Sequence, residues 1–363
     1  MKQSTDLPAV PRDAAAPVRR VPGLALVSSP LRLAHDAEPV PQSWSAALAE
    51  LAGFLGIDTA WVPAPDAAAP VFAPWTGWSA AAFQNGGCAR LPEAQFVASY
   101  CIDLGGGASG QPGGVDIALI SPHPSVCKAQ AADLPGTGTL RAMVRAAAAE
   151  GRARIAIVCH ARQCGPLAAL RLGEDPSLCG EGLSLDILAI EEALPALMAA
   201  SAPWDAVIAM PDLRSIVFTL LGETSGVRGP WPMLWHSRGV RRVTCETRSE
   251  GSVGEIGRMP LDAPALVHTL ALTLKAAGKG GAALRLHAAW AQLRERGVTT
   301  AARGSDAPYA TEVTDAEFIT LLRRDGTAAH RTPVRWQALK DSHGINFGSQ
   351  TPPLRVISAN LAN

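Results

Sequence analysis

Short apolar runs alternate along this chain with longer stretches in which Ala and Leu recur at helical spacing. Short apolar runs are typical of strands that are buried on both faces, and their alternation with helices is the pattern of an α/β protein. The pattern predicts strands over five ranges, namely Gly23–Val27, Thr59–Val62, Val115–Ile120, Arg154–Val158 and Ala206–Met210.

Helices are predicted where apolar positions recur every three or four residues. The helix Ser45–Leu55 is followed by Gly56, and Leu140–Glu150 is followed by Gly151; glycine suits the left-handed conformation that ends many helices. The other predicted helices are Asp186–Ala200, Ala263–Ala277, Ala282–Arg296 and a last one that begins at the capping box Thr314-x-x-Glu317 and ends at Arg324.

Three segments lack such a pattern. The region with Trp75 and Trp78 among Pro and Gly is predicted to be rich in loops. Residues 1–20 are predicted to be a flexible tail, because they lack the apolar core of a secretory signal. Residues 325–363 have weak periodicity and are predicted to form an arm or a tail.

Composition excludes several classes of partner. Lys+Arg and Asp+Glu balance at 32 each in 363 residues, so no net field favours nucleic acid. No apolar run reaches the ~18–20 residues that span a bilayer, so a cytoplasmic location is expected. The seven cysteines include no Cys-x-x-Cys pair and are expected to be reduced thiols. Cys159 and Cys164 form the closest pair, without a second cluster to complete a zinc site.

The stretch from Trp204 to Leu221 carries a more specific signal. An aromatic–Asp pair, Trp204-Asp205, opens a buried strand that leads into Met-Pro-Asp-Leu-Arg-Ser-Ile-Val-Phe-Thr-Leu-Leu. This layout resembles the central segment of the isopropylmalate and isocitrate dehydrogenases, in which two aspartates one helical turn apart bind the divalent metal. The corresponding positions here are Ile216 and Leu220, whose side chains offer no oxygen to a hard cation.

The resemblance spans roughly residues 21–324 and implies a fold. That fold is a two-domain α/β protein with a mixed central sheet flanked by helices. A large discontinuous domain, 21–98 and 254–324, is expected around a small central dimerisation domain, 99–253. The carrying segments are the helix and strand from Leu140 to Cys164, the pair Leu185-Asp186, the loop Glu246–Gly257 and the helix pair 263–296.

The resemblance also implies site residues. His160 stands where the family has a catalytic lysine, and Asp186 is the remaining metal-ligand position, with helix N-cap as the other reading. Arg141, Arg162 and Arg214 are the candidates for holding substrate carboxylates, and a solvated charge on a helix is the alternative for each.

The nucleotide site is altered as well. Glu246, Gly257 and Asp262 are the positions that correspond to the cofactor loop and its end, but the residues between Glu246 and Gly257 differ from the family's. A glycine pattern at Gly105, Gly107 and Gly110 is followed by Pro and Gly instead of a helix, which argues against a dinucleotide fingerprint.

Together these losses predict a catalytically silent member of the family, a pseudoenzyme that binds a small dicarboxylate and needs no cofactor. It would form a homodimer, or a heterodimer with an active homologue. The alternative is a divergent NAD(P)-dependent oxidoreductase of the decarboxylating type with His160 as base, which would need NAD(P) and Mg²⁺ or Mn²⁺. A third possibility is a metal-independent enzyme that uses the arginines.

Overall fold

The computed structural model describes residues 30–35, 40–63, 69–83, 91–104, 114–128, 133–175, 182–199, 202–227, 229–247, 261–301, 310–325 and 336–340. Ten of its strands belong to the central sheet. They are β1 (Leu31–Ala34), β2 (Thr59–Val62), β3 (Val71–Ser79), β4 (Phe96–Asp103), β5 (Val115–Pro122), β8 (Arg154–Cys159), β9 (Ser184–Ala189), β10 (Ala206–Ala209), β11 (Trp231–His236) and β12 (Arg242–Thr247).

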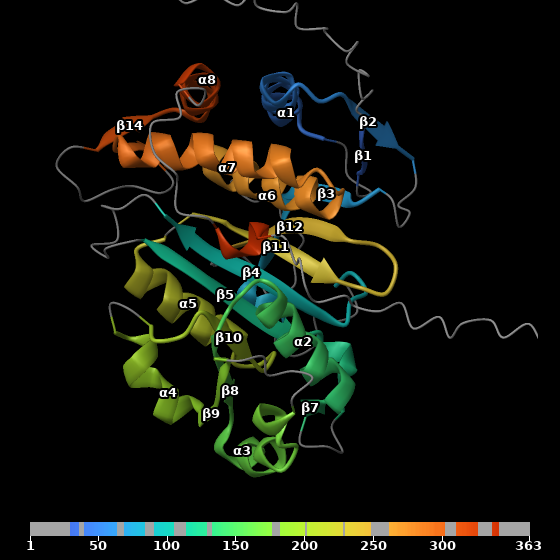
Figure 1. Cartoon of the computed structure of the whole chain (residues 1–363), viewed down its shortest axis with the longest axis vertical. Helices are drawn as coiled ribbons and strands as arrows, with labels where there is room; N and C mark the ends of the chain where they lie inside the picture. Colours follow the sequence, from blue (N-terminus) through green and yellow to red (C-terminus); the bar gives the residue numbers. More distant parts are fainter. Residues whose placement is uncertain are drawn as a thin grey trace, which may run out of the picture.

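The helices lie on both sides of this sheet (Figure 1). They are α1 (Gln42–Leu55), α2 (Thr137–Ala149), α3 (Ala161–Ala168), α4 (Ile190–Leu197), α5 (Arg214–Ser225), α6 (Ala263–Ala276), α7 (Gly280–Glu295) and α8 (Asp315–Asp325). Single 3₁₀ turns are η1 (Ala80–Phe83), η3 (Pro124–Val126), η5 (Leu172–Glu174) and η6 (Gln337–Leu339). Two short strand pairs lie outside the sheet, β6 (Cys127–Lys128) with β7 (Leu134–Pro135) and β13 (Val298–Thr300) with β14 (Thr311–Val313).

The sheet is mixed, and its strand order is β2-β1-β3-β12-β11-β4-β5-β10-β8-β9. Antiparallel pairs occur in the middle, where β4 lies between β5 and β11, and β11 also pairs with β12. The outer pairs are parallel on both sides. The prediction of an α/β protein with a mixed central sheet flanked by helices is confirmed.

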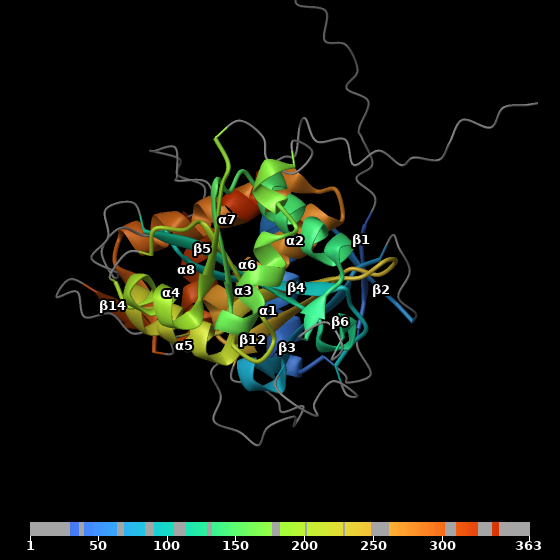
Figure 2. The same cartoon turned by 90° about the horizontal axis from the view of Figure 1, so that it is seen from below.

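Alternate residues of the strands pack into two separate hydrophobic cores. On β10, Ala206 and Ile208 point into the core that α2, α6 and α7 cover, whereas Val207 and Ala209 point into the core under α4 and α5. Figure 2 shows α2 and α5 on opposite sides of the central strands. Because successive strand side chains face opposite ways, a strand buried on both faces is apolar at nearly every position, as its sequence predicted.

Several predicted helices are confirmed together with their ends. Gly56, after α1, has φ 65° and donates its N–H to the last turn, and Gly151, after α2, has φ 80°. The capping box at α8 also forms: the backbone N–H of Thr314 donates to the Glu317 carboxylate at 2.9 Å, and the Glu317 N–H donates to the Thr314 hydroxyl at 3.3 Å.

Two predicted segments are wrong. The predicted helix Asp186–Ala200 is strand β9 followed by the shorter helix α4, because pairing with β8 holds Asp186 in an extended conformation opposite Ala156. The region with Trp75 and Trp78 is not a loop but strand β3, in which the register against β12 shifts. Such an irregularity accommodates Pro and Gly within a strand.

The predicted strand Gly23–Val27 and the tail 1–20 lie outside the described residues. Pairing of β4, β11 and β12 in the centre of the sheet was not predicted. No described helix has the length and apolarity needed to cross a membrane.

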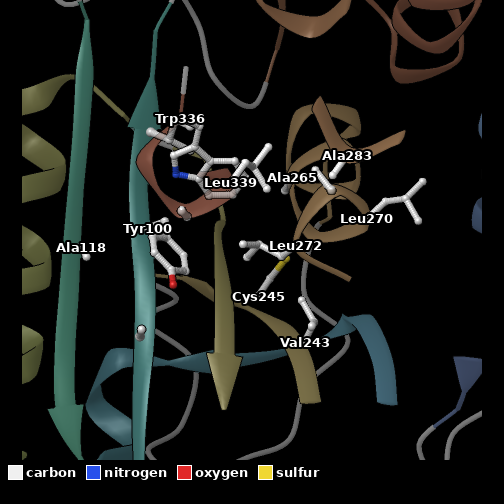
Figure 3. Packing of buried hydrophobic residues seen from close by; sticks show 14 of the residues in the cluster. Tyr100, Ala118, Val243, Cys245, Ala265, Leu270, Leu272, Ala283, Trp336 and Leu339 are labelled. Atoms are coloured by element: carbon white, nitrogen blue, oxygen red, sulfur yellow. The ribbon is translucent and has the colours of Figure 1, made fainter. Parts of the chain in front are cut away.

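A piece of the predicted C-terminal arm lies in the core. Trp336 is fully buried, and its ring packs edge-on against Tyr100 with 5.5 Å between ring centroids (Figure 3). The Lys275 ammonium donates hydrogen bonds to the backbone carbonyls of Ala338 and Lys340, which fixes η6 beside the end of α6. Residues 336–340 are therefore part of the folded body.

The segments expected to share the large domain touch one another. Arg323 of α8 forms an ion pair with Glu50 of α1 at 2.9 Å, and Arg285 of α7 donates to the Phe54 carbonyl at 2.7 Å. The sheet itself continues from β2 to β9 without a break. The division into two domains stays a prediction.

Candidate functional site

A buried ion pair lies where the segments that resemble the metal and cofactor motifs meet. Arg214 is the first residue of α5, and Glu246 lies near the end of β12. Arg214 Nε donates to one carboxylate oxygen of Glu246 at 2.8 Å, and Nη2 donates to the other at 2.5 Å. Both side chains are 0% exposed.

Two serines complete this network. Arg214 Nη1 donates to Ser121 Oγ on β5 at 2.8 Å, and Nη2 donates to Ser99 Oγ on β4, also at 2.8 Å. The Ser99 hydroxyl in turn donates to Glu246. The guanidinium also lies 4.9 Å from the centre of the Phe83 ring. The bidentate geometry and the two hydroxyls satisfy the buried charges.

The positions that correspond to the family's metal ligands do not fit a divalent cation. Ile216 is 44% exposed on α5, and Leu220 is half-buried against the core under α4 and α5. Asp186 lies on β9 and accepts a hydrogen bond from the Trp204 indole at 3.0 Å. Among the described residues no group of three His, Cys, Asp or Glu side chains is placed to hold a metal ion.

The aromatic–Asp pair that carried the resemblance has a structural role. Trp204 is buried and bonded to Asp186, as above. Asp205 accepts hydrogen bonds from the backbone N–H groups of Ala153 and Arg154 at 3.1 and 2.9 Å. Burial raises the pKa of Asp205, but its hydrogen bonds to Arg154 and Ala153 outweigh burial and lower it overall. The pair fastens the start of β10 to β8 and β9.

His160 and Asp212 form a second polar arrangement at the surface. His160 follows β8, and Asp212 follows β10; these strands are parallel neighbours, so their carboxyl ends lie side by side. His160 Nε2 lies 2.5 Å from the Asp212 carboxylate, and the two side chains are 36% and 47% exposed. An imidazole oriented by a carboxylate can act as a general base.

Each of the three arginines predicted to hold a dicarboxylate pairs with a different acidic residue. Arg141 on α2 pairs with Asp175 at 3.3 Å, and Arg162 on α3 pairs with Asp133 at 3.3 Å. Arg141 and Arg162 are well exposed, whereas Arg214, the first residue of α5, is buried. The structure gives each arginine its own acidic partner.

The predicted cofactor positions have separate surroundings. Glu246 binds Arg214, and Asp262 caps α6 by accepting the Ala265 N–H at 2.7 Å. Gly257 lies outside the described residues. That Glu246, Gly257 and Asp262 bind a cofactor stays a prediction.

A cavity of about 540 Å³ opens between α2, α6 and the ends of β4 and β11. Three cationic side chains line it, Arg145, Arg241 and Lys275, with Glu150 as the acidic residue. His236 also lines the cavity and stacks on Phe96 with 4.2 Å between ring centroids. Burial, and then the charge of Arg241, lower the pKa of His236 to about 4, so its imidazole is neutral near pH 7.

Sequence analysis missed this cavity. The helical spacing of Arg141 and Arg145 is visible in the sequence, but Arg241 and Lys275 come from the β11–β12 turn and the end of α6. Only the packing of α6 against β11 places them beside α2.

Comparison with known proteins identifies the architecture. No protein-family model matches the chain, and no curated protein matches it in sequence. The structure is similar to that of isocitrate dehydrogenase from Methylococcus capsulatus, with a TM-score of 0.53 and 12% identity over 81% of this chain and 98% of that one. This chain has an isocitrate dehydrogenase-like fold.

A second structure supports the same conclusion. The TT0538 protein from Thermus thermophilus matches with a TM-score of 0.56 and 13% identity, over 85% of this chain and 70% of that one. At such identities the likeness concerns the isocitrate dehydrogenase-like fold alone, and activity has to be argued from side chains.

Proposed function

We propose that this protein is a non-catalytic binding or accessory subunit built on the isocitrate dehydrogenase-like fold. The supporting observation is the buried pair of Arg214 and Glu246. A guanidinium and a carboxylate that satisfy each other, with no exposed atom, cannot also bind a substrate or a cofactor. The segments that resemble the catalytic motifs hold the core together instead.

Loss of the metal ligands supports the same proposal. Oxidative decarboxylation of a 2-hydroxy acid depends on a cation that polarises the forming carbonyl. Ile216 and Leu220 offer no oxygen ligand, and Asp186 is bonded to Trp204. The residues present do not fit such a cation.

The cavity beside α2 favours a small organic anion as the ligand. Its volume lies within the range of small-molecule sites. Arg145, Arg241 and Lys275 supply positive charge, and the stacked rings of Phe96 and His236 supply an apolar surface. A dicarboxylate with a short carbon chain suits this cavity, because it carries negative charge for the cationic side chains and a carbon chain for the apolar surface.

A second candidate function rests on the contact between His160 and Asp212. A base at this position would favour a divergent NAD(P)-dependent oxidoreductase. Both side chains are well exposed, and neither lines the cavity beside α2. The oxidoreductase is therefore the second candidate function.

Steady-state assays separate the two. The purified chain is tested for NAD(P)H formation with isopropylmalate, isocitrate, malate and tartrate in the presence of Mn²⁺. We expect no turnover above background, and His160→Ala should behave as the wild type. Turnover above ~1 s⁻¹, the low end of ordinary enzymes, that is lost in His160→Ala would establish the oxidoreductase instead.

A further inference from the structure

Two thiols face each other at the end of β8. Cys159 is the last residue of that strand, and Cys164 lies in the first turn of α3, with His160 between them. Their sulfur atoms are 3.4 Å apart. Cys159 also donates to the Leu188 carbonyl at 3.6 Å, and Cys164 donates to the His160 carbonyl at 3.7 Å.

The two thiols differ in access to solvent. Cys159 is fully buried, whereas Cys164 is half-buried at the edge of the same hydrophobic core. Burial, and then the hydrogen bond to Cys164, raise the pKa of Cys159 to about 12. Because Cys164 is the more accessible of the two sulfurs, it meets an oxidant first, and Cys159 is the one that closes the bond.

We propose that Cys159 and Cys164 form a reversible intramolecular disulfide when the protein meets a hydroperoxide. The Cys164 thiolate attacks the terminal peroxide oxygen, and the O–O bond breaks. A sulfenic acid and an alkoxide result, or hydroxide in the case of hydrogen peroxide, and this leaving group takes up the proton that Cys164 released. The Cys159 sulfur then attacks the Cys164 sulfur, the S–O bond breaks, and the leaving hydroxide takes the Cys159 proton. In sum, two thiols and one hydroperoxide give one disulfide, water and the corresponding alcohol, or a second water from hydrogen peroxide.

The local backbone permits this closure. A disulfide bond is about 2.05 Å long, so the sulfurs must approach by about 1.4 Å from 3.4 Å. Pro166 lies inside α3 and has no N–H to donate to the carbonyl of Arg162, four residues earlier. Gly165 adds backbone freedom next to Cys164. The first turn of α3 is therefore held by fewer hydrogen bonds than an ordinary helix.

Two other cysteines contact oxygen atoms. Cys101 interacts with the Ser225 hydroxyl at 3.1 Å, and Cys127 donates to the His123 carbonyl at 3.9 Å. Burial, and then the charges of Asp133 and Asp212, raise the pKa of Cys127 to about 12. Cys127 is thus a suitable control.

Closure would act on His160. The disulfide ring contains His160, whose imidazole contacts Asp212. Tying the end of β8 to α3 restricts the backbone on both sides of that imidazole.

Tryptic mapping tests the proposal directly, because Arg162 lies between the two cysteines. Trypsin separates peptide 155–162, which holds Cys159, from peptide 163–171, which holds Cys164. The full reduced chain is treated with equimolar hydrogen peroxide, blocked with iodoacetamide and digested. We expect the two peptides to be joined in the oxidised sample and separate after dithiothreitol.

Variants and an unfolded control show whether the disulfide is specific to this pair and depends on the fold. Cys159→Ser and Cys164→Ser should lose the joined peptides, whereas Cys127→Ser should keep them. The joined pair should form faster in the folded chain than in urea, where the proximity of the sulfurs is lost. Oxidation of Cys164 to sulfinic acid alone, pairing with another cysteine, or equal rates in urea would overturn the proposal. Should Cys159→Ser fail to fold, Cys164→Ser still decides it.

Discussion

Arg214 and Glu246 face each other in the interior of this protein, joined by two hydrogen bonds of 2.8 and 2.5 Å. One residue comes from the segment that resembles a metal motif, and the other begins the segment that resembles a cofactor loop. In an isocitrate dehydrogenase-like fold this pairing ties α5 to the middle of the sheet through β12, β4 and β5. A buried pair of this kind matters for stability mainly through the cost of breaking it.

The first prediction concerns that cost. Arg214→Ala leaves the Glu246 carboxylate buried without its partner, and removal of one member of a buried pair costs about 3–5 kcal/mol. The free energy of unfolding, measured by urea denaturation, should fall by that amount. The double variant Arg214→Met/Glu246→Leu should recover much of the loss, because both charges are then gone.

Arg162→Ala is the matched control. Its ion pair with Asp133 is 67% and 58% exposed, and exposed pairs contribute ~0–1 kcal/mol. Equal losses for Arg162→Ala and Arg214→Ala would show that the buried pair has no special role in stability.

The second prediction concerns pH and His236. Its pKa is about 4 in the folded protein and about 6.5 when unfolded, so the unfolded chain binds a proton first as pH falls. The stability that neutral His236 provides is therefore complete above about pH 6.5 and declines as pH falls towards 4. In His236→Phe, which preserves the stack on Phe96, the free energy of unfolding should fall less over this range. Parallel profiles for the variant and the wild type would refute the shift.

The third prediction concerns metal. Ligand-linked stabilisation grows as RT ln(1 + [L]/Kd), so a chain without a cation site should melt at the same temperature with and without millimolar Mg²⁺ or Mn²⁺. Calorimetry on wild type and Asp186→Ala provides the measurement. An increase in Tm with Mn²⁺ that disappears in Asp186→Ala would mean that Asp186 binds metal.

The fourth prediction concerns assembly. Ile216 is 44% exposed on α5, and Met198, at the end of the neighbouring α4, is 64% exposed. The two helices pack against each other, and contiguous exposed apolar patches are typical of interaction surfaces. We expect a homodimer, or a heterodimer with an active homologue, and Ile216→Arg should shift it towards monomer in analytical ultracentrifugation. A wild-type chain that is monomeric at micromolar concentration and copurifies with no partner would contradict this.

The fifth prediction concerns the ligand. Succinate or malate should raise Tm if the cavity between α2 and α6 binds a small dicarboxylate. Arg241→Gln removes a charge from the cavity wall and should reduce that shift, whereas Arg162→Gln, on α3, should leave it intact. A shift that depends on Arg162 and not on Arg241 would place the anion elsewhere.

Local pattern was sufficient for much of the secondary structure. The helices α1, α2, α6 and α7 and the strands β5, β8 and β10 lie within a few residues of their predicted ranges. These elements depend on apolar spacing and capping residues that lie close together in the sequence, so the sequence alone is enough to predict them. The lack of oxygen ligands for a metal at Ile216 and Leu220 is also evident from the sequence, because residue type alone decides whether a side chain carries an oxygen.

Strand pairing decided the rest. β9 resembles the start of a helix in sequence, but pairing with β8 makes it a strand, and β3 tolerates Pro and Gly through its irregular register against β12. Arg214 could be recognised as a charged residue in an unusual place, but its partner lies on a strand in the middle of the sheet. The sulfurs of Cys159 and Cys164 likewise meet only because α3 folds back beside the end of β8. Hydrogen-bond ladders and burial join residues distant in sequence, and no local pattern records which of them meet.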